Sequence, residues 1–397
     1  MSDDDVIVRI AARGDGVTAD GRYAAYAAPG DWLRGDGSVE RGPDHADPAC
    51  RHFPKCGGCQ LQHLSDRAFT AYLTDRIVGA LDGQGLAAPA MLAPHLSPPQ
   101  SRRRLALRAE RRGKQVLLGF NEGASHKIVE LRECPVMRPE LFALLGPLRT
   151  LLPLMLRDKR TADIRMTMTD QGVDIMIAGV EAEGLAAAEA ITAFAAAHKL
   201  ARLSLDEGYG PAARWEPDPV TVTLGGIAVP LPEGAFLQAT SEGEAALISA
   251  VRAIVGDAAE VADLFAGLGT FSFAVSGRVH AVEAARDVVL ALQTSANLAK
   301  RLVSSDHRDL YRRPLTVAEL ARFDAVILDP PRAGAQEQVV ALAASSVPCI
   351  AYVSCNPATF ARDAKILIEG GYQLISIKPV GQFRWSTHVE LAAEFSR

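Results

Sequence analysis

Long hydrophobic runs are missing from this sequence of 397 residues. No apolar stretch reaches the roughly 18–20 residues that a helix needs to cross a bilayer, which argues against a membrane protein. The first residues, MSDDDVIVRI, lack the basic region and the apolar core of a secretory signal. With 48 % hydrophobic and 22 % charged residues, the composition is that of a globular protein. We therefore expect a cytoplasmic monomer of two or three domains that has no membrane partner.

A global excess of positive charge, the usual mark of a nucleic-acid-binding protein, is also absent, because the formal net charge is −5. This average conceals a local excess, since residues 101–165 contain fifteen basic and seven acidic side chains. Clustered positive charge on an acidic protein is expected where a phosphate backbone binds. A solvated charged surface gives the same pattern, so charge alone leaves both interpretations open.

Cysteines are few, but four of the six follow a pattern. Cys50, Cys56 and Cys59 lie close together in CRHFPKCGGCQLQHL, and Cys134 follows far along the chain in LRECPVM. Clustered cysteines in a cytosolic protein indicate a metal site more often than a disulfide. From spacing alone, zinc with four thiolate ligands is the default interpretation. An iron–sulfur cluster also takes four thiolates, commonly with a proline beside a ligand, and Pro135 follows Cys134.

Changes of pattern divide the chain into three parts. Short β patterns separated by Gly and Asp turns occupy the start, and helical periodicity follows at 66–81. A basic hairpin around Arg112-Gly113 and an alanine-rich helix at 185–200 predict an α+β region in the middle. Later in the chain, apolar runs of strand length alternate with helical stretches, which predicts βαβ units in a parallel, doubly wound sheet. The expected domains are 1–45, 46–235 and 236–397.

The segment VADLFAGLGTFSFAV, residues 261–275, predicts a strand, a glycine turn and the start of a helix. Gly267 and Gly269 would let the backbone pass close to a ligand. Glu283 ends the next predicted strand, where a carboxylate can accept hydrogen bonds from both ribose hydroxyls. The third glycine of a dinucleotide-binding motif is missing. This favours a cofactor without phosphates, S-adenosylmethionine, over NAD.

Two further segments place reactive groups at the ends of predicted strands. DAVILDPPRAG delivers Asp329 to a rigid Pro-Pro turn, which resembles the turns of methyltransferases that act on planar bases. VSCNPATFARDA places Cys355 after an apolar strand, whereas Cys349 inside that strand is expected to be an apolar filler. A thiolate can add to C6 of uracil and thereby make C5 nucleophilic. Glu390, with His388 nearby in WSTHVELAAEFSR, is a candidate base for the C5 proton.

The motifs FLQAT, DLFAGLGTFS, LDPPRAG, VSCNPATFARD and HVELAAEFSR together resemble the RNA 5-methyluridine methyltransferase family, specifically its iron–sulfur-containing 23S rRNA branch. The resemblance implies an α/β fold. A C-terminal class I, Rossmann-like methyltransferase domain would follow an α+β middle domain and a shortened β domain similar to the TRAM or OB barrel. It also implies methylation of uridine C5 in 23S rRNA, with S-adenosylmethionine as the methyl donor and RNA as the partner.

The resemblance assigns roles to individual residues. Cys355 matches the nucleophile and Glu390 matches the proton acceptor. Either Asp306 or Asp309 would approach the adenine, and Thr270 stands where relatives often carry asparagine. The positions that match the cofactor site are Gln238, Phe265, Glu283 and Asp329. The positions that match the ligands of a 4Fe–4S cluster are Cys50, Cys56, Cys59 and Cys134.

Three alternatives stay open at this point. The same chemistry could act on the T-loop uridine of tRNA, although the four cysteines favour rRNA because the tRNA enzymes of the family usually lack them. An adenine amino-methyltransferase would need an aromatic residue after the two prolines, where this chain has Arg332. A non-catalytic iron–sulfur RNA-binding protein would have no use for Cys355 and Glu390.

Overall fold

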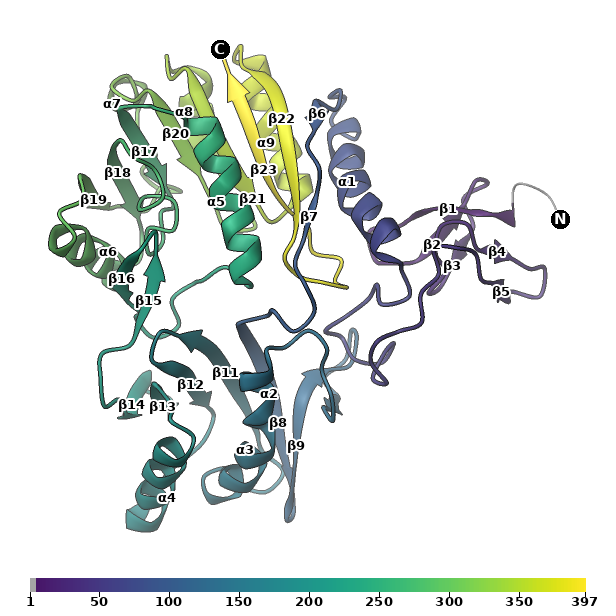
Figure 1. Cartoon of the computed structure of the whole chain (residues 1–397), viewed down its shortest axis with the longest axis vertical. Coiled ribbons are helices and arrows are strands. Elements are labelled where there is room, and N and C mark those ends of the chain that lie inside the picture. The colour runs from purple at the N-terminus through teal and green to yellow at the C-terminus, as the bar shows by residue number, and fades with distance from the viewer. Residues whose placement is uncertain (1–4) are drawn as a thin grey trace. The chain divides into compact units, whose positions relative to one another are not determined.

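The computed structural model describes residues 5–397, so the first four residues of the acidic start lie outside it. The chain divides into two compact units, each assembled from stretches that are far apart in the sequence (Figure 1). The first unit consists of the described residues up to Phe69, Pro98–Thr221 and Phe383–Thr387. The second consists of Thr70–Ser97, Val222–Gln382 and His388–Arg397. Within the described residues, no helix is long and apolar enough to cross a membrane.

Five short strands begin the first unit. The first three form an antiparallel sheet, and the other two pair with each other. The buried Asp31 carboxylate accepts hydrogen bonds from the backbone N–H groups of Ala28 and Gly42, both at 2.7 Å, and so ties the loops together. In chain order the strands are β1 (Ile7–Ile10), β2 (Gly16–Thr18), β3 (Tyr23–Ala24), β4 (Trp32–Leu33) and β5 (Val39–Glu40).

A seven-stranded sheet with the order β10-β9-β8-β11-β12-β13-β14 forms the larger part of the first unit. Successive side chains of a strand point to opposite faces, so Leu105 and Leu107 of β8 are buried while Arg104 and Arg108 lie on the other face. The strands are β8 (Arg104–Arg112), β9 (Gln115–Asn121), β10 (Ile128–Glu130), β11 (Thr161–Thr169), β12 (Gly172–Ala178), β13 (Arg202–Asp206) and β14 (Pro211–Trp215).

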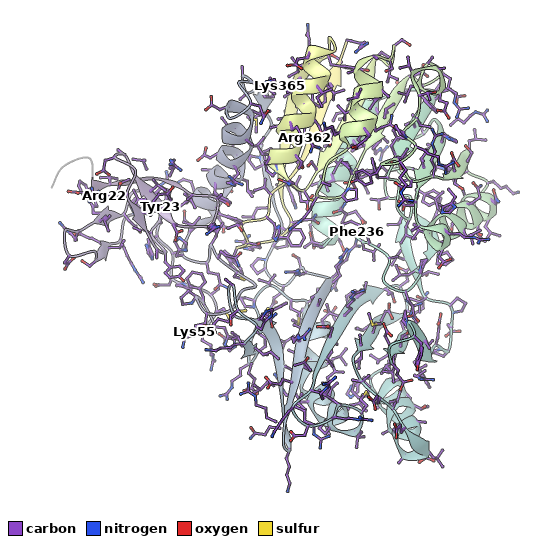
Figure 2. The ribbon with its side chains drawn as sticks, turned by 180° about the vertical axis from the view of Figure 1, so that it is seen from behind. Arg22, Tyr23, Lys55, Phe236, Arg362 and Lys365 are labelled. Carbon is purple, nitrogen blue, oxygen red and sulfur yellow. The ribbon has the colours of Figure 1, made fainter. Side chains whose placement is uncertain are left out.

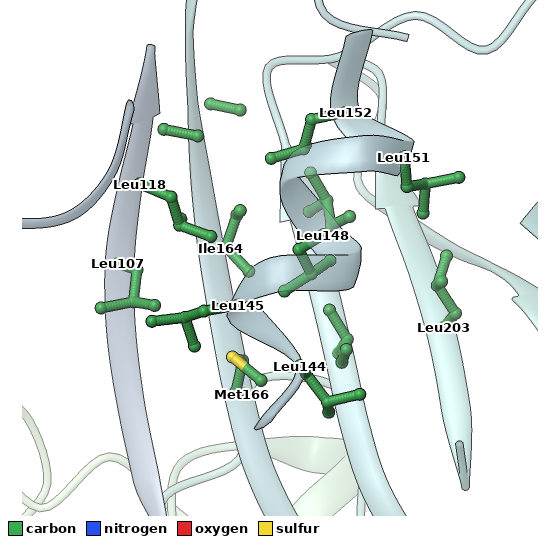
Figure 3. Packing of buried hydrophobic residues seen from close by; sticks show 14 of the residues in the cluster. Leu107, Leu118, Leu144, Leu145, Leu148, Leu151, Leu152, Ile164, Met166 and Leu203 are labelled. Carbon is green, nitrogen blue, oxygen red and sulfur yellow. The ribbon is translucent and has the colours of Figure 1, made fainter. Parts of the chain in front are cut away.

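Helical segments cover the buried face of this sheet. They are α2 (Pro139–Ala143), α3 (Leu145–Leu151), the 3₁₀ turn η2 (Leu152–Leu154) and α4 (Gly184–Ala197). Figure 3 shows Leu145 and Leu148 of α3 packed over Leu107, Leu118 and Ile164 of the sheet. Burial of one such side chain stabilises the fold by about 1.5–3 kcal/mol. The alanine-rich helix expected at 185–200 is confirmed as α4.

The second unit is built on a nine-stranded sheet with the order β19-β18-β17-β20-β21-β23-β22-β6, to which β7 adds by pairing with β22. Its strands are β6 (Ala90–Met91), β7 (His95–Leu96), β17 (Glu260–Leu264), β18 (Arg278–Glu283), β19 (Val303–His307), β20 (Ala325–Leu328), β21 (Cys349–Ser354), β22 (Gln373–Gly381) and β23 (Glu390–Ser396). A small hairpin of β15 (Thr221–Leu224) and β16 (Ile227–Pro230) precedes the sheet's central strands in the sequence.

Helices cover both faces of the second unit's sheet, with α5 on one face and α9 on the other (Figure 1). The helices are α1 (Asp66–Asp82), α5 (Ser241–Val255), α6 (Arg286–Leu298), α7 (Val317–Leu320), α8 (Gln336–Ala343) and α9 (Pro357–Glu369). The helix predicted at 66–81 is confirmed as α1, which belongs to this unit from Thr70 onward.

The pairing from β19 to β21 is parallel, as the alternation of strands and helices predicts. The last part of the sheet is antiparallel, because β23 pairs antiparallel with both β21 and β22. The connection between β22 and β23 contains no helix, so the chain returns as a hairpin. The carboxyl ends of β17, β20 and β21 meet at one edge, where α/β proteins bind their ligands.

Candidate active site

Cys355 lies at the carboxyl end of the buried strand β21, where helix α9 begins. The side-chain oxygen of Asn356 caps this helix by accepting a hydrogen bond from the backbone N–H of Ala358 at 3.1 Å. Pro357 occupies the first helical position, where its missing N–H removes no helical hydrogen bond. The Ser354 hydroxyl accepts the N–H of Asn356 at 3.2 Å. The half-buried thiol is therefore presented on a turn with a fixed backbone.

The loop after β20, which carries Asp329, is tied to this turn. Asn356 Nδ2 and Thr359 Oγ1 both donate hydrogen bonds to the carbonyl oxygen of Arg332, at 3.0 and 3.1 Å. Asp329 begins the loop, and its N–H donates to the carbonyl of Leu264 at 3.3 Å. The carboxylate and the thiol thus lie on two turns whose relative position the backbone determines.

A buried carboxylate on α9 fixes the far end of the same loop. Asp363 accepts hydrogen bonds from the N–H of Ala335 at 2.8 Å and from the hydroxyl of Tyr352 at 2.6 Å. Gly334 has a φ of 81°, and an added Cβ there would lie 2.6 Å from the Asp363 side chain. Glycine at 334 is therefore required both by the backbone conformation and by this close approach.

Glu390 reaches the thiol from the last strand of the chain. The antiparallel pairing of β21 with β23 ends with Ser354 opposite Leu391, and Cys355 and Glu390 are the residues next to this last pair. Glu390 acts electrostatically on the thiol of Cys355. The Glu390 side chain is buried, and Arg332 contacts His388, two residues before it. The site thus joins a thiol, two carboxyl groups and one guanidinium group.

Burial dominates the electrostatics of this group. It raises the pKa of Glu390 to about 7, against the opposing effects of a Gln382 hydrogen bond and the Arg332 charge. It also raises the pKa of Asp329 well above its usual value, and Glu390 adds to that effect. The pKa of the Cys355 thiol is raised to about 11 by burial, then by Glu390 and Asp329, while Arg332 lowers it. Because the pKa values of Glu390, Asp329 and Cys355 are all raised, these groups can hold protons that a reaction transfers between them.

Two glutamines connect the carboxyl groups. Gln238 is buried, and its Nε2 lies 3.5 Å from Oδ2 of Asp329. Gln382 donates a hydrogen bond from Nε2 to Oε1 of Gln238 at 2.8 Å. Sequence reasoning singled out Gln238, Asp329 and Glu390, and the structure brings them together. It missed Gln382, because this residue lies between two strands and belongs to no recognisable motif.

The glycine turn after β17 adopts an unusual backbone conformation. Phe265, Gly267 and Gly269 have φ values of 63°, 54° and 93°. The carboxylate of Glu283, at the end of β18, accepts the N–H of Gly267 at 3.1 Å and the N–H of Ala284 at 2.8 Å. Glu283 therefore shapes the turn. The turn continues in separate hydrogen-bonded turns, whereas the sequence predicted a helix start.

The buried carboxyl group of Asp263 is hydrogen-bonded to the segment that follows the glycine turn. Ser272 Oγ donates to Oδ2 of Asp263 at 2.5 Å, and burial raises the pKa of Asp263 to about 7. On the other side, the ring of Tyr311 packs against Phe265 with centroids 5.5 Å apart, and its hydroxyl donates to Gly334 at 3.0 Å. Tyr311 links the glycine turn to the Asp-Pro-Pro loop. No sequence motif indicated it.

The two candidates for an adenine contact lie in or after β19. Asp306 is within the strand, and Asp309 follows it. One oxygen of Asp309 accepts the N–H of Tyr311 at 3.0 Å, which orients its side chain beside the aromatic pair.

The four clustered cysteines lie in the first unit and line one pocket with an apolar wall. Burial raises the pKa of Cys50, Cys56 and Cys59, the last to about 12, and Cys134 acts electrostatically on all three. Two contacts hold the distant segments together: Arg132 donates its N–H to Nε2 of His52 at 3.0 Å, and Arg51 pairs with Glu133 at 3.0 Å. Cys134, which the sequence analysis grouped with the other three, lines the same pocket as they do.

Among the described residues, no three Cys, His, Asp or Glu side chains are close enough to hold a single metal ion. A polynuclear cluster has a different requirement, because each thiolate binds a different iron and the four sulfurs stand farther apart. All six cysteines are free thiols. Arg102 lines the same pocket. Burial lowers the pKa of its guanidinium group, while Cys59 and Cys134 act in the opposite direction, which favours the cation. This donor set fits an anionic cluster that is ligated by four thiolates.

The arginines of the predicted basic hairpin are largely engaged in local contacts. Arg112 pairs with Glu110, Arg108 pairs with Asp163, and Arg111 donates to backbone carbonyl groups. Positive charge gathers instead at the start of β8. Burial lowers the pKa of Arg104, and the neighbouring Arg102, Arg103 and Arg165 lower it further. Like charges held together in this way suit a surface that binds an anion.

Residues 227–396 match the family described as tRNA (Uracil-5-)-methyltransferase. A protein of Zymomonas mobilis named as an RNA methyltransferase is 52 % identical over 98 % of this chain and 99 % of its own length. The 23S rRNA (uracil(1939)-C(5))-methyltransferase RlmD of Photorhabdus laumondii is 31 % identical over 89 % of this chain and 83 % of its own. The tRNA (uracil-54, C5)-methyltransferase of Pyrococcus abyssi, solved with S-adenosyl-L-homocysteine, has the same fold, with a TM-score of 0.72, 22 % identity and coverage of 98 % and 99 %.

Proposed function

Because the chain belongs to the RNA uracil-C5 methyltransferase family, we propose that it methylates C5 of a uridine in 23S rRNA through a covalent bond from Cys355 to the base. One observation carries this proposal: Cys355 directly follows β21, Glu390 begins the neighbouring strand β23, and the two groups are close enough that Glu390 acts electrostatically on the thiol, at the edge of the sheet where the cofactor turn also lies. A nucleophile and a base placed near each other supply both the addition and the elimination that the reaction needs.

The first step is addition of the Cys355 sulfur to C6 of the uracil ring. The S–C6 bond forms, and the electrons of the C5=C6 double bond make C5 nucleophilic. The thiol must lose its proton to solvent for this step. Burial raises its pKa to about 11, and the positive charge of Arg332 acts in the opposite direction and favours the thiolate. Gln238 and Asp329 are assigned to the polar edge of the base, an assignment supported by their contact at 3.5 Å beside the thiol's turn.

The second stage transfers a methyl group and releases the product. When bound, S-adenosylmethionine would supply the methyl group: the bond from C5 to this carbon would form as its bond to the sulfonium sulfur breaks, with S-adenosylhomocysteine as the leaving group. The carboxylate of Glu390 then takes the C5 proton, the electrons of that C–H bond restore the C5=C6 double bond, and the sulfur leaves C6 as a thiolate. The role of Glu390 is supported by its buried position and by its pKa of about 7, which leaves a usable fraction ionised at neutral pH.

Cofactor binding falls to the residues around the glycine turn. Glu283 is suited to accept hydrogen bonds from ribose hydroxyls, and the ring of Phe265 is suited to pack on the cofactor's apolar surface. Asp263 and Tyr311 support the turn rather than contact the ligand. The absence of a phosphate-binding third glycine agrees with S-adenosylmethionine.

We assign RNA recognition to residues of both units, because one unit presents clustered arginines and the other an exposed aromatic side chain. The arginines at the start of β8 suit a phosphate backbone. Phe236 is 61 % exposed, and it precedes Gln238 by two residues (Figure 2). An exposed aromatic ring near the site suits stacking with a base of single-stranded RNA, from which the target uridine must be splayed.

The choice of 23S rRNA rests on the four-cysteine pocket and on the similarity to RlmD. Purified protein is expected to transfer labelled methyl groups to unmodified 23S rRNA at least about tenfold faster than to unmodified tRNA. The measurement is methyl incorporation into both RNAs at equal concentration, followed by mapping of 5-methyluridine. Faster methylation of tRNA at a T-loop uridine would contradict the rRNA assignment and leave the chemistry intact.

The four-cysteine pocket is proposed to hold a 4Fe–4S cluster through Cys50, Cys56, Cys59 and Cys134. When bound, the cluster would join the loop around residues 46–64 to the segment before α2. The guanidinium group of Arg102 would offset its negative charge, since a buried anion is stable only with compensating charge. Nothing in the described residues indicates electron transfer, so a structural role is assigned.

Anaerobically purified protein is expected to contain about four iron atoms and four sulfide ions per chain, because each of the four thiolates would bind one iron of the cluster. The measurement is metal analysis together with acid-labile sulfide, and Cys59→Ser is expected to reduce both. Cys349→Ser, which changes a cysteine outside the pocket, is the matched control and should leave the iron content unchanged. One zinc ion per chain without sulfide would contradict the cluster.

A further inference from the structure

Gln382 lies directly after β22 and is a buried side chain that the mechanism has not used. It contacts the group of site residues that includes Gln238 and Glu390. The side chain is 2 % exposed, so its amide has no access to water as an alternative hydrogen-bond partner. Its Oε1 accepts the backbone N–H of Ala239 at 2.9 Å. Its Nε2 donates to Oε1 of Gln238 at 2.8 Å. Val380, two residues earlier in β22, pairs with Glu390 of β23, and the Gln382 side chain acts on the Glu390 carboxylate as a hydrogen-bond partner that lowers its pKa.

The orientation of this amide follows from its partners. A backbone N–H can only donate, so the group facing Ala239 must be the amide oxygen of Gln382. The amide nitrogen must then face the opposite direction, toward Gln238 and Glu390. Its two hydrogens match these two acceptors. The alternative orientation would place two donors together at Ala239 and leave acceptors without donors at the other end.

The packing around Gln382 prevents it from moving away. An added Cβ at Gly243, in the first turn of α5, would lie 2.5 Å from Cβ of Gln382. The preceding residue, Gly381, pairs with Leu96 of β7, and its carbonyl accepts the N–H of Ser97 at 3.1 Å. The side chain is thus enclosed between α5 and the edge strand β7. Because residue 243 is glycine and has no Cβ, the Gln382 side chain fits against this turn of α5.

We propose that Gln382 is a positioning residue of the methyltransferase, which aims the Glu390 carboxylate at the C5 proton and holds that carboxylate in its ionised, proton-accepting form. This inference rests on the proposed function, since it assigns a task within the release step. Other charged or titratable groups that act on Glu390 or respond to it are Arg332 and Asp329 from the loop after β20 and Cys355 from the turn after β21. Of these, only Arg332 supplies positive charge.

The direction of the pH effect follows from the donor. A hydrogen bond from a neutral amide to a carboxylate stabilises the ionised form, so the Gln382 contact keeps the pKa of Glu390 lower than burial alone would set it. Removing the donor therefore raises this pKa, and less carboxylate is available at pH 7. Release of the product is slowed at neutral pH and recovers at higher pH.

The test separates addition from proton removal. RNA that carries tritium at C5 of uridine releases tritium to water only when the C5 proton is removed. RNA that contains 5-fluorouridine forms a stable adduct after addition and methyl transfer, because its fluorine cannot be abstracted. With Gln382→Met, which is similar in shape and has no donor, adduct formation is expected to stay within about twofold of wild type. The midpoint of the pH profile of tritium release is expected to rise by about one unit from its wild-type value near 7, which corresponds to a roughly fivefold slower release at pH 7.

Two further variants exclude a merely structural role. Gln382→Glu keeps an acceptor for the N–H of Ala239 but places a second carboxylate beside Glu390, so a larger upward shift is expected. Gln338→Met is the matched control: Gln338 is 1 % exposed, and its amide oxygen and nitrogen bond the N–H and carbonyl of Leu315 at 2.7 and 3.2 Å. It should lower thermal stability and leave the pH profile unmoved.

The outcomes are distinguishable from failure of the proposed function. If wild-type protein releases no tritium and forms no adduct with any RNA, the function itself fails. If wild-type protein does both, and Gln382→Met shows an unmoved pH midpoint or loses adduct formation and tritium release in parallel, the function stands and the assignment of Gln382 is overturned.

Discussion

Replacing Cys355 by alanine is expected to abolish both uridine methylation and the covalent adduct with 5-fluorouridine RNA. No other thiol of the second unit can replace it, since Cys349 lies at the opposite end of β21. Loss of a nucleophile typically lowers the catalytic rate constant by a factor on the order of 10⁴ or more. The measurements are methyl incorporation and the appearance of a slower-migrating protein–RNA band under denaturing conditions. Cys355→Ser should be inactive as well, because a hydroxyl group is a poorer nucleophile toward the ring.

The matched control is Cys349→Ala. This thiol lies in the same strand, and its Sγ donates to the carbonyl of Ile254 at 3.3 Å, away from the carboxyl edge. The variant should keep wild-type adduct formation at a small cost in thermal stability. An adduct that persists in Cys355→Ala would show that another residue attacks C6, and the covalent mechanism proposed for Cys355 would then be wrong.

Replacing Glu390 by glutamine is expected to stop the reaction after methyl transfer. Addition and methylation do not need the base, so the methylated RNA should remain bound to Cys355, and a covalent complex should accumulate even with natural uridine. Loss of a general base typically slows its step by about 10²–10⁴-fold. In the wild-type protein, release should accelerate as the pH rises through about 7, because the carboxylate is the active form and its pKa is raised to that range by burial.

Glu394→Gln provides the comparison for this variant. Glu394 lies in the same strand, and its carboxylate accepts a hydrogen bond from Ser376 at 2.9 Å. It is not among the groups that act on the thiol of Cys355. Its pH profile should match that of the wild type. If Glu390→Gln releases methylated RNA at the wild-type rate, another group removes the C5 proton, and Asp329 is then the nearest carboxyl group of the site to test.

The sequence predicted the site well where the required residues lie in local motifs. A strand that ends in Asp-Pro-Pro or Ser-Cys-Asn-Pro places its polar residue at the carboxyl edge of a parallel sheet, so Asp329 and Cys355 could be assigned without coordinates. The helices α4 and α6 were predictable for a similar reason, because their periodicity is local.

Features that depend on long-range packing could not be predicted in this way. Gln382 has no motif, and its task follows only from the three partners that the fold brings to it. The antiparallel return of β23 depends on the hairpin after β22, which the pattern of strands and helices did not distinguish from another crossover. Strands β6 and β7 join the second unit's sheet from a segment about 280 residues earlier in the chain, and two-residue strands carry no periodicity.

The segment Phe383–Thr387, which belongs to the first unit although both of its neighbours in the chain belong to the second, limits how this protein can be recombined. The carbonyl of Trp385 accepts the N–H groups of Gln60 and Leu61, at 2.8 and 2.9 Å, and Arg384 pairs with Asp66. A gene fragment that encodes only the C-terminal stretch would carry this segment without the groups that bind it. Exchange of the cysteine-containing unit between homologues must therefore include a short insert near the end of the chain, just before Glu390.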